Sequence, residues 1–200
     1  MSSQAIAAII LAAGQSKRMG QPKMLLPWGK TTVLGQVAGV FGEAGLGEIV
    51  VVTGAEREKV EGLVNGLARK YPVRSIHNAA YLSGEMLSSL QCGLAALSPE
   101  MEAAFIGLGD QPQMEPGTVR NILEAFGRSQ GRIVVPSYQM RRGHPWLVPR
   151  SLWSEMLAWK APRTLRDFLN TYVDKIRYVP VETPSVLEDL DTPEDYKRHP

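Results

Sequence analysis

The residues of this chain best suited to chemistry begin with a segment of glycines and cations. From Leu11 to Lys23 it reads LAAGQSKRMGQPK. Glycines let successive backbone N–H groups converge on an anion, and Arg18 and Lys23 can add full positive charge to the same oxygens. The segment therefore favours binding of a polyphosphate. The alternative is an ordinary surface turn with solvated cations.

The glycine spacing excludes the two commonest phosphate-binding loops. A GxGxxG motif is absent here, because no glycine lies between Gly14 and Gly20. A P-loop that ends in Gly29-Lys30-Thr31 would need its first glycine at position 24, which is Met24. The segment is therefore a different kind of loop.

A candidate metal ligand follows another apolar run, in the string GLGDQP at residues 107–112. If that run is a parallel strand, Asp110 emerges at its carboxyl end, where such sheets bind ligands. Magnesium takes one or two carboxylates together with substrate phosphates, so Asp110 facing a triphosphate would be adequate. Gly-Asp and Gln-Pro also favour turns, which is the structural alternative for Asp110.

A second acidic cluster, EDLDTPED, occupies residues 188–195. If residues 188–191 are extended, Asp189 and Asp191 point to one side and Leu190 to the other. Thr192 and Pro193 have the residue types of a helix N-cap and first helical position. Helix initiation accounts for the later acids of the cluster but not for Asp189 and Asp191.

A basic segment, RRGHP at residues 141–145, fits an anionic group. A guanidinium group can bind two oxygens of one phosphate at once, so Arg141 and Arg142 suit a dianionic phosphate. His144 would more often be structural when taken alone.

Short apolar runs alternate with amphipathic helical stretches, which predicts a single α/β domain over residues 1–200, a three-layer sandwich around a mostly parallel sheet. The run at residues 5–11 is apolar on both faces, as a strand covered by helices requires. We expect further strands at 48–53, 73–77, 103–108, 132–136, 146–148 and 175–181. Helical spacing of apolar residues falls between them, as in Leu87, Leu90 and Leu94.

Composition limits the other classes of function. A formal net charge of +2 is too small to indicate a nucleic-acid surface. The longest apolar run is about half of the ~20 residues that cross a bilayer, so no membrane-spanning helix is expected. No basic region precedes this run, so we expect no signal peptide. The single cysteine, Cys92, excludes an internal disulfide and is consistent with a reducing cytoplasm. Cys92 could be a nucleophile, but its place among helically spaced leucines favours a buried structural role.

The loop at residues 11–23 resembles the signature loop of the nucleotidyltransferases related to the molybdenum cofactor cytidylyltransferases and guanylyltransferases. It is more similar to the cytidylyltransferase branch, where LAAG is followed by PKxLLP, as in residues 22–27 here. The guanylyltransferase branch has LAGG, so Ala13 points to CTP. GDQP, RGHP and DLDTPEDY also resemble segments of this family. The resemblance implies a nucleotide-diphospho-sugar transferase type of fold, Rossmann-like in its layers.

The same resemblance implies transfer of CMP from CTP to the terminal phosphate of a molybdopterin cofactor, with release of pyrophosphate and with Mg²⁺ present. Catalysis would fall to Arg18, Lys23 and Asp110. The metal would be held by Asp110 and Asp191, with Asp189 in support. The nucleotide would meet the loop residues Leu11, Ala12, Ala13, Gly14, Gln15, Arg18 and Lys23. The acceptor would meet Asn78, Ser88, Ser89, Arg142 and His144.

Several alternatives stay open from the residues alone. Ser88 could lie at a helix N-terminus that binds phosphate, or could simply cap it. Lys160 and the basic residues of 163–166 could serve the acceptor or be solvated. A sugar- or polyol-phosphate nucleotidyltransferase would share the loop and the acids, and a non-catalytic nucleotide-binding or chaperone module could keep the fold. A molybdoenzyme or its maturation factor is the implied partner.

Overall fold

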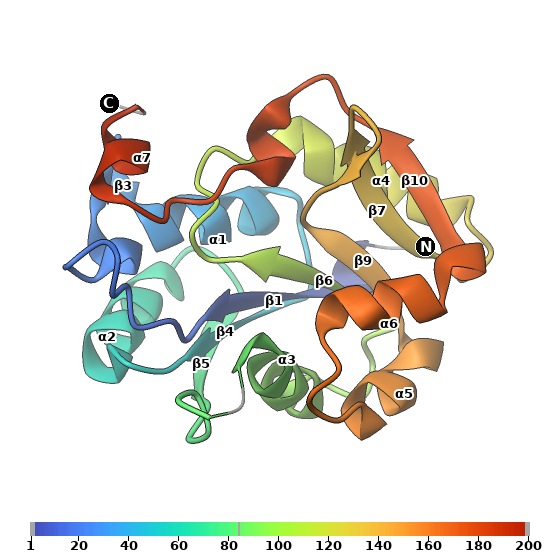
Figure 1. Ribbon diagram of the computed structural model, residues 1–200, viewed down its shortest axis with the longest axis horizontal. Coiled ribbons are helices and arrows are strands. Elements are labelled where there is room, and N and C mark those ends of the chain that lie inside the picture. The colour runs from blue at the N-terminus through green and yellow to red at the C-terminus, as the bar shows by residue number, and fades with distance from the viewer. Residues whose placement is uncertain (1–2, 84, 199–200) are drawn as a thin grey trace.

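The computed structural model describes residues 3–83 and 85–198 and places them around one eight-stranded sheet (Figure 1). The strand order is β10-β7-β9-β6-β1-β4-β5, with the short β8 added to β7. The strands are β1 (Ile6–Ala12), β4 (Glu48–Thr53), β5 (Val73–His77), β6 (Ala103–Leu108), β7 (Ile133–Tyr138), β8 (Arg141–Arg142), β9 (Trp146–Pro149) and β10 (Ile176–Pro180). The predicted α/β class is confirmed.

Most neighbouring strands run parallel, but β9 is antiparallel to both β6 and β7. The predicted strands are all present, with ends that differ by up to two residues from those expected. The sequence pattern did not predict β8 or a separate hairpin of β2 (Pro27–Trp28) and β3 (Thr31–Thr32). These pieces are only two residues long, too short to show an alternating pattern.

The central strand β1 is buried on both faces, as its composition predicts. Its alternate residues enter two separate hydrophobic clusters: Ile10 belongs to one and Ile9 to the other. Helices α1 (Val33–Glu43), α2 (Arg57–Leu67) and α4 (Pro116–Gly127) pack on the first face. Helices α3 (Glu85–Ala96), α5 (Trp153–Ala158) and α6 (Leu165–Thr171) cover the second face, below the sheet in Figure 1.

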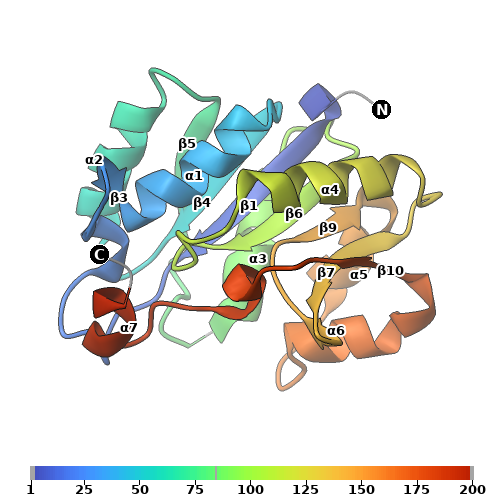
Figure 2. The ribbon, with the colours of Figure 1, turned by 90° about the horizontal axis from the view of Figure 1, so that it is seen from above.

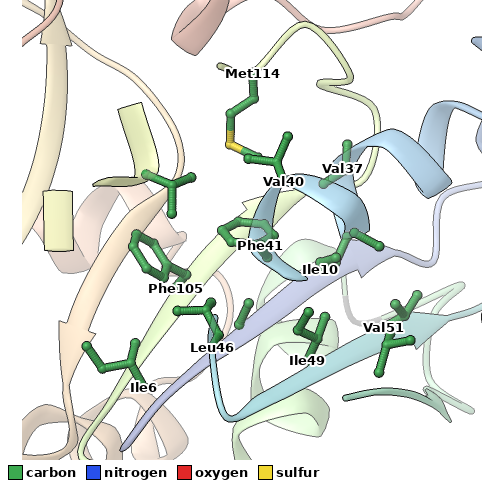
Figure 3. Close-up of a cluster of buried hydrophobic side chains, with 14 of the residues drawn as sticks. Ile6, Ile10, Val37, Val40, Phe41, Leu46, Ile49, Val51, Phe105 and Met114 are labelled. Carbon is green, nitrogen blue, oxygen red and sulfur yellow. The ribbon is translucent and has the colours of Figure 1, made fainter. Parts of the chain in front are cut away.

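The first cluster fixes the middle of the sheet against α1. Phe41 of α1 is fully buried, and its ring centroid lies 5.4 Å from that of Phe105 on β6 (Figure 3). Burying an aromatic or branched side chain of this size contributes about 1.5–3 kcal/mol. Beneath this contact β1 and β6 pair in parallel, with Leu11 opposite Leu108 at their carboxyl ends.

The C-terminal segment returns to the carboxyl edge of the sheet and ends in α7 (Pro193–Lys197). As predicted, Thr192 is the N-cap of α7, in a capping box with Asp195. Leu190 is 1% exposed and packs in a third cluster with Met19 and Val33. The hydroxyl of Tyr196 donates to the carbonyl of Pro27, which ties α7 to the β2–β3 hairpin (Figures 1 and 2). This returning segment places residues 189–191 beside the first loop.

Candidate active site

The loop after β1 is held by hydrogen bonds that centre on Ser16. The N–H groups of Met19 and Gly20 both donate to the carbonyl of Ser16, and the Ser16 hydroxyl accepts from the Lys23 N–H at 3.2 Å. Gly20 has φ +70°, a conformation that side chains disfavour, so the turn requires glycine there. Met19 is buried in the third cluster, which holds the centre of the loop down.

Gly14 faces open space, whereas the glycine packed behind the loop does not. A Cβ on Gly14 would meet no atom within 4 Å. A Cβ on Gly54 would lie 2.3 Å from the Ala13 carbonyl oxygen. Gly54 therefore lets β4 approach the loop closely, and Gly14 leaves the other side of the loop open to a ligand.

The two strand ends meet at a group of charges. The pairing of β1 with β6 continues past the end of β6, where the Gly109 N–H donates to the Leu11 carbonyl at 3.0 Å. Asp110, the next residue, therefore lies beside the loop. The Lys23 ammonium donates to Asp110 at 2.5 Å and to Asp191 at 3.2 Å. Arg18 reaches the other oxygen of Asp191 at 3.0 Å. The predicted cations and acids thus form one connected ionic cluster.

The cluster is graded from buried to exposed. The side chain of Lys23 is 10% exposed, whereas that of Arg18 is 70% exposed. Burial alone would lower the pKa of Lys23, but the charge and hydrogen bond of Asp110, with those of Asp191, raise it above its usual 10.5. Lys23 therefore stays a fixed cation.

Asp189 lies beside this cluster and has a neutral hydrogen-bond partner. Its carboxylate accepts a hydrogen bond from the side chain of Gln111 at 2.7 Å. Burial, followed by the neighbouring charge of Asp110, raises the pKa of Asp189 to about 6, and the Gln111 bond opposes that rise. The three aspartates thus differ in environment although they lie together.

A cavity of about 400 Å³ opens on this cluster. Of the predicted residues, Leu11, Ala13, Gly14, Arg18, Lys23, Ser89, Asp110, Asp189 and Asp191 line this first cavity. Its lining does not include Ala12, which is buried in β1, or Gln15, which is exposed. Four further residues that were not among the predicted site residues complete the lining: Met24, Tyr81, Met86 and Leu108.

Asn78 lies behind the first cavity and links β5 to α3. Its side-chain amide donates to the hydroxyls of Ser88 and Ser89 at 2.9 and 3.0 Å. Its carbonyl oxygen accepts from the N–H of Ala80. α3 begins at Glu85, so Ser88 lies inside the helix and is not its N-cap, and both serine hydroxyls accept hydrogen bonds from Asn78.

A second cavity, of about 990 Å³, adjoins the first, and Met86 lines both. Arg142 and His144, the residues expected to meet the acceptor, line the second cavity together with Arg141, Arg163 and Arg166. Lys160 does not line it. Among the lining residues that the structure describes there are four arginines and no carboxylate.

His144 contributes no charge to this cavity. Its ring stacks on Trp146 with centroids 4.5 Å apart, and burial lowers its pKa to about 4. Its Nε2 atom is buried without a hydrogen-bond partner among the described residues. The positive character of the second cavity therefore comes from its arginines.

Cys92 has a structural position. It lies on α3, partly buried, and its Sγ contacts the carbonyl of His77. Burial raises the pKa of the thiol, the opposite of what a nucleophile requires.

Comparison with known proteins places this arrangement in a family. The family model described as "MobA-like NTP transferase domain" matches residues 8–176. The chain belongs to this family. The match covers most of β1, the loop after it, Asp110 and the residues that line the arginine-rich cavity.

Two curated relatives of this MobA-like protein cover nearly the whole chain. It is 30% identical to the molybdenum cofactor cytidylyltransferase of Escherichia coli, over 96% of this chain and 94% of that protein. It is also 30% identical to the nicotine blue oxidoreductase of Paenarthrobacter nicotinovorans, over 96% of this chain and 95% of that protein. The family model gives the nucleotidyltransferase class, and the two relatives, which are named for different reactions, leave the substrates to be proposed.

Among solved structures, this MobA-like protein resembles Rv0371c of Mycobacterium tuberculosis. The TM-score is 0.82 at 28% identity, and 98% of each chain is covered. Rv0371c has also been solved in complex with manganese, at a TM-score of 0.77. In the described part of the present chain, no helix is long and apolar enough to cross a membrane.

Proposed function

We propose that this protein transfers CMP from CTP to the terminal phosphate of a molybdopterin-type molybdenum cofactor and releases pyrophosphate. The observation that carries the proposal is the contact between two unlike cavities at Met86. The first presents an acid–cation cluster to a polyphosphate, and the second presents arginines to an anionic acceptor. The curated cytidylyltransferase relative supports these two substrates.

The reaction needs positioning more than proton transfer. A phosphate monoester is largely ionised at neutral pH, because its second pKa is about 6, so the attacking oxygen needs no general base. Transfer of a phosphoryl-type group depends mainly on in-line placement and on stabilisation of charge. Arg18 and Lys23 would stabilise the triphosphate and the leaving pyrophosphate, while Gly14 and its neighbours allow close approach of the nucleotide.

The acids fit a divalent metal that is shared with substrate. Asp110 and Asp191 would hold the metal, because both carboxylates already face one cationic group, the ammonium of Lys23. No group of three or more His, Cys, Asp or Glu able to hold a metal occurs among residues 3–83 and 85–198. Two carboxylates with phosphate oxygens are the set that magnesium prefers. When bound, Mg²⁺ would offset charge on the phosphates, and Asp189 would support the two ligands.

The choice of CTP rests on Ala13. Its side chain lines the first cavity, where the guanylyltransferase branch has glycine. We propose that the enzyme works in the cytoplasm, and that a molybdoenzyme or its maturation factor receives the product.

Pyrophosphate release tests the proposal directly. Each of the four NTPs is supplied with Mg²⁺, with and without molybdenum cofactor, and pyrophosphate is measured. Release only with CTP and cofactor together is expected. Release with a sugar or polyol phosphate in place of the cofactor would favour the rival transferase, and absence of release with every acceptor would refute the transferase proposal.

A further inference from the structure

The Arg142 guanidinium is held by two uncharged side chains. Its Nε donates to the Tyr178 hydroxyl at 2.8 Å, and one terminal nitrogen donates to the Asn170 carbonyl oxygen at 2.7 Å. The guanidinium carbon also lies 5.7 Å from the centre of the Tyr178 ring. The three residues come from β8, α6 and β10, so contacts between distant segments fix the orientation of the arginine.

The neutral character of these partners separates Arg142 from the cations of the first cavity. Arg18 and Lys23 are both paired with carboxylates. Arg142 has no ion pair within residues 3–83 and 85–198. Its charge is therefore uncompensated in place, although its geometry is fixed.

The geometry leaves this charge available to a ligand. Arg142 and Asn170 both line the second cavity. A guanidinium has five N–H donors, and the two contacts use two of them. The remaining donors can bind an oxyanion, and a fixed guanidinium loses less side-chain entropy when it does so.

We propose that Asn170 and Tyr178 are positioning residues that keep Arg142 oriented and uncompensated for the phosphate of the acceptor. The inference rests on the proposed function insofar as it names the acceptor phosphate as the ligand. The amide of Asn170 suits this role, because it accepts a hydrogen bond from Arg142 without carrying a negative charge. An aspartate of the same shape would orient Arg142 as well, but its negative charge would compensate that of the guanidinium.

Asn170→Asp therefore distinguishes two roles of the contact: keeping Arg142 uncompensated, or only holding β8 against α6. If the contacts only fasten β8 to α6, this substitution is harmless or stabilising. If Arg142 must stay uncompensated, Asn170→Asp raises the KM for the molybdenum cofactor about tenfold, with the KM for CTP and the Tm unchanged. Tyr178→Phe keeps the ring and loses the hydroxyl, and should raise the acceptor KM about threefold.

Asn121→Asp is the matched control, because Asn121 is exposed on α4 and the change adds the same charge away from the cavity. It should leave both KM values unchanged. Asn170→Ala adds no charge and should raise the acceptor KM less than Asn170→Asp does. An Asn170→Asp enzyme with wild-type acceptor KM, or with equal changes for CTP and acceptor, would overturn the inference.

A binding experiment distinguishes this inference from the proposed function. Calorimetric titration with inorganic phosphate at low ionic strength, without nucleotide or metal, measures anion binding independently of catalysis, and the difference between Asn170→Asp and the wild type isolates the contribution of Arg142. The wild type and Asn121→Asp should bind phosphate alike, and Asn170→Asp about tenfold more weakly. This result would support the Arg142 site even if the cofactor assay failed, whereas equal binding to Asn170→Asp, or no binding to the wild type, would refute it.

Discussion

The ammonium of Lys23 lies 2.5 Å from the carboxylate of Asp110, across 87 positions of sequence. This pair joins the loop after β1 to the carboxyl end of β6, and Asp191 adds the C-terminal segment to the same ammonium. Loop, strand end and C-terminal segment are therefore coupled at one charged point.

Asp110→Asn should abolish most of the transferase activity. The amide keeps the shape of the side chain but removes the charge opposite Lys23, and turnover should fall about a thousandfold. Pyrophosphate release measures the effect, and circular dichroism should show an intact fold. Asp174→Asn removes an equal charge at an exposed position and should change neither. Near-normal turnover of Asp110→Asn would refute the role of this acid.

Arg18→Ala should weaken nucleotide binding with little change in stability. The Arg18 side chain is 70% exposed, and an exposed ion pair such as that with Asp191 contributes about 0–1 kcal/mol to folding. Charge-assisted contacts with a triphosphate are stronger, so the affinity for CTP should fall about tenfold. Calorimetric titration of CTP with Mg²⁺ checks this. Lys17→Ala, a charge removed from the adjacent exposed position, is the control; equal losses in both variants would argue against a specific role for Arg18.

Gly14→Ala should affect nucleotide binding, whereas Gly54→Ala should affect the stability of the fold. A methyl group on Gly14 meets open space, so the Tm should be unchanged while the affinity for CTP falls. A methyl group on Gly54 strikes the Ala13 carbonyl, which should destabilise the fold by about 1–3 kcal/mol. Thermal unfolding and CTP titration of both variants test the contrast. Unchanged CTP affinity in Gly14→Ala would show that nucleotide does not approach this side of the loop.

His144 should make the fold less stable in mild acid. Its pKa falls from 6.5 to about 4 on folding, so between these values the unfolded chain binds the extra proton. Stability is therefore lost as pH falls from about 6.5 towards about 4, by about 2 kcal/mol at pH 4.5 relative to pH 7.5. Urea unfolding at the two pH values measures this, with His144→Gln as the comparison. If the variant loses as much stability as the wild type between those values, His144 is not the cause.

The sequence predicts those parts of the molecule that depend on local pattern. The two apolar faces of β1 and the place of Asp110 after β6 both follow from residues adjacent in sequence. The antiparallel direction of β9 does not, because an apolar run of four residues carries no signal of the strands beside it. The partners of Arg142 were missed for the same reason: Asn170 and Tyr178 are ordinary residues of a helix and a strand until the fold brings them to β8.

The position of Asp191 in the chain has a consequence for biosynthesis. Lys23 and Asp191 are separated by 168 positions, so the ribosome completes the loop long before it makes the acid that reaches it. During that interval a nascent chain can pair Lys23 at most with Asp110. The full charge cluster can therefore form only after residues 189–191 have emerged from the exit tunnel, later than the loop and Asp110 that share it.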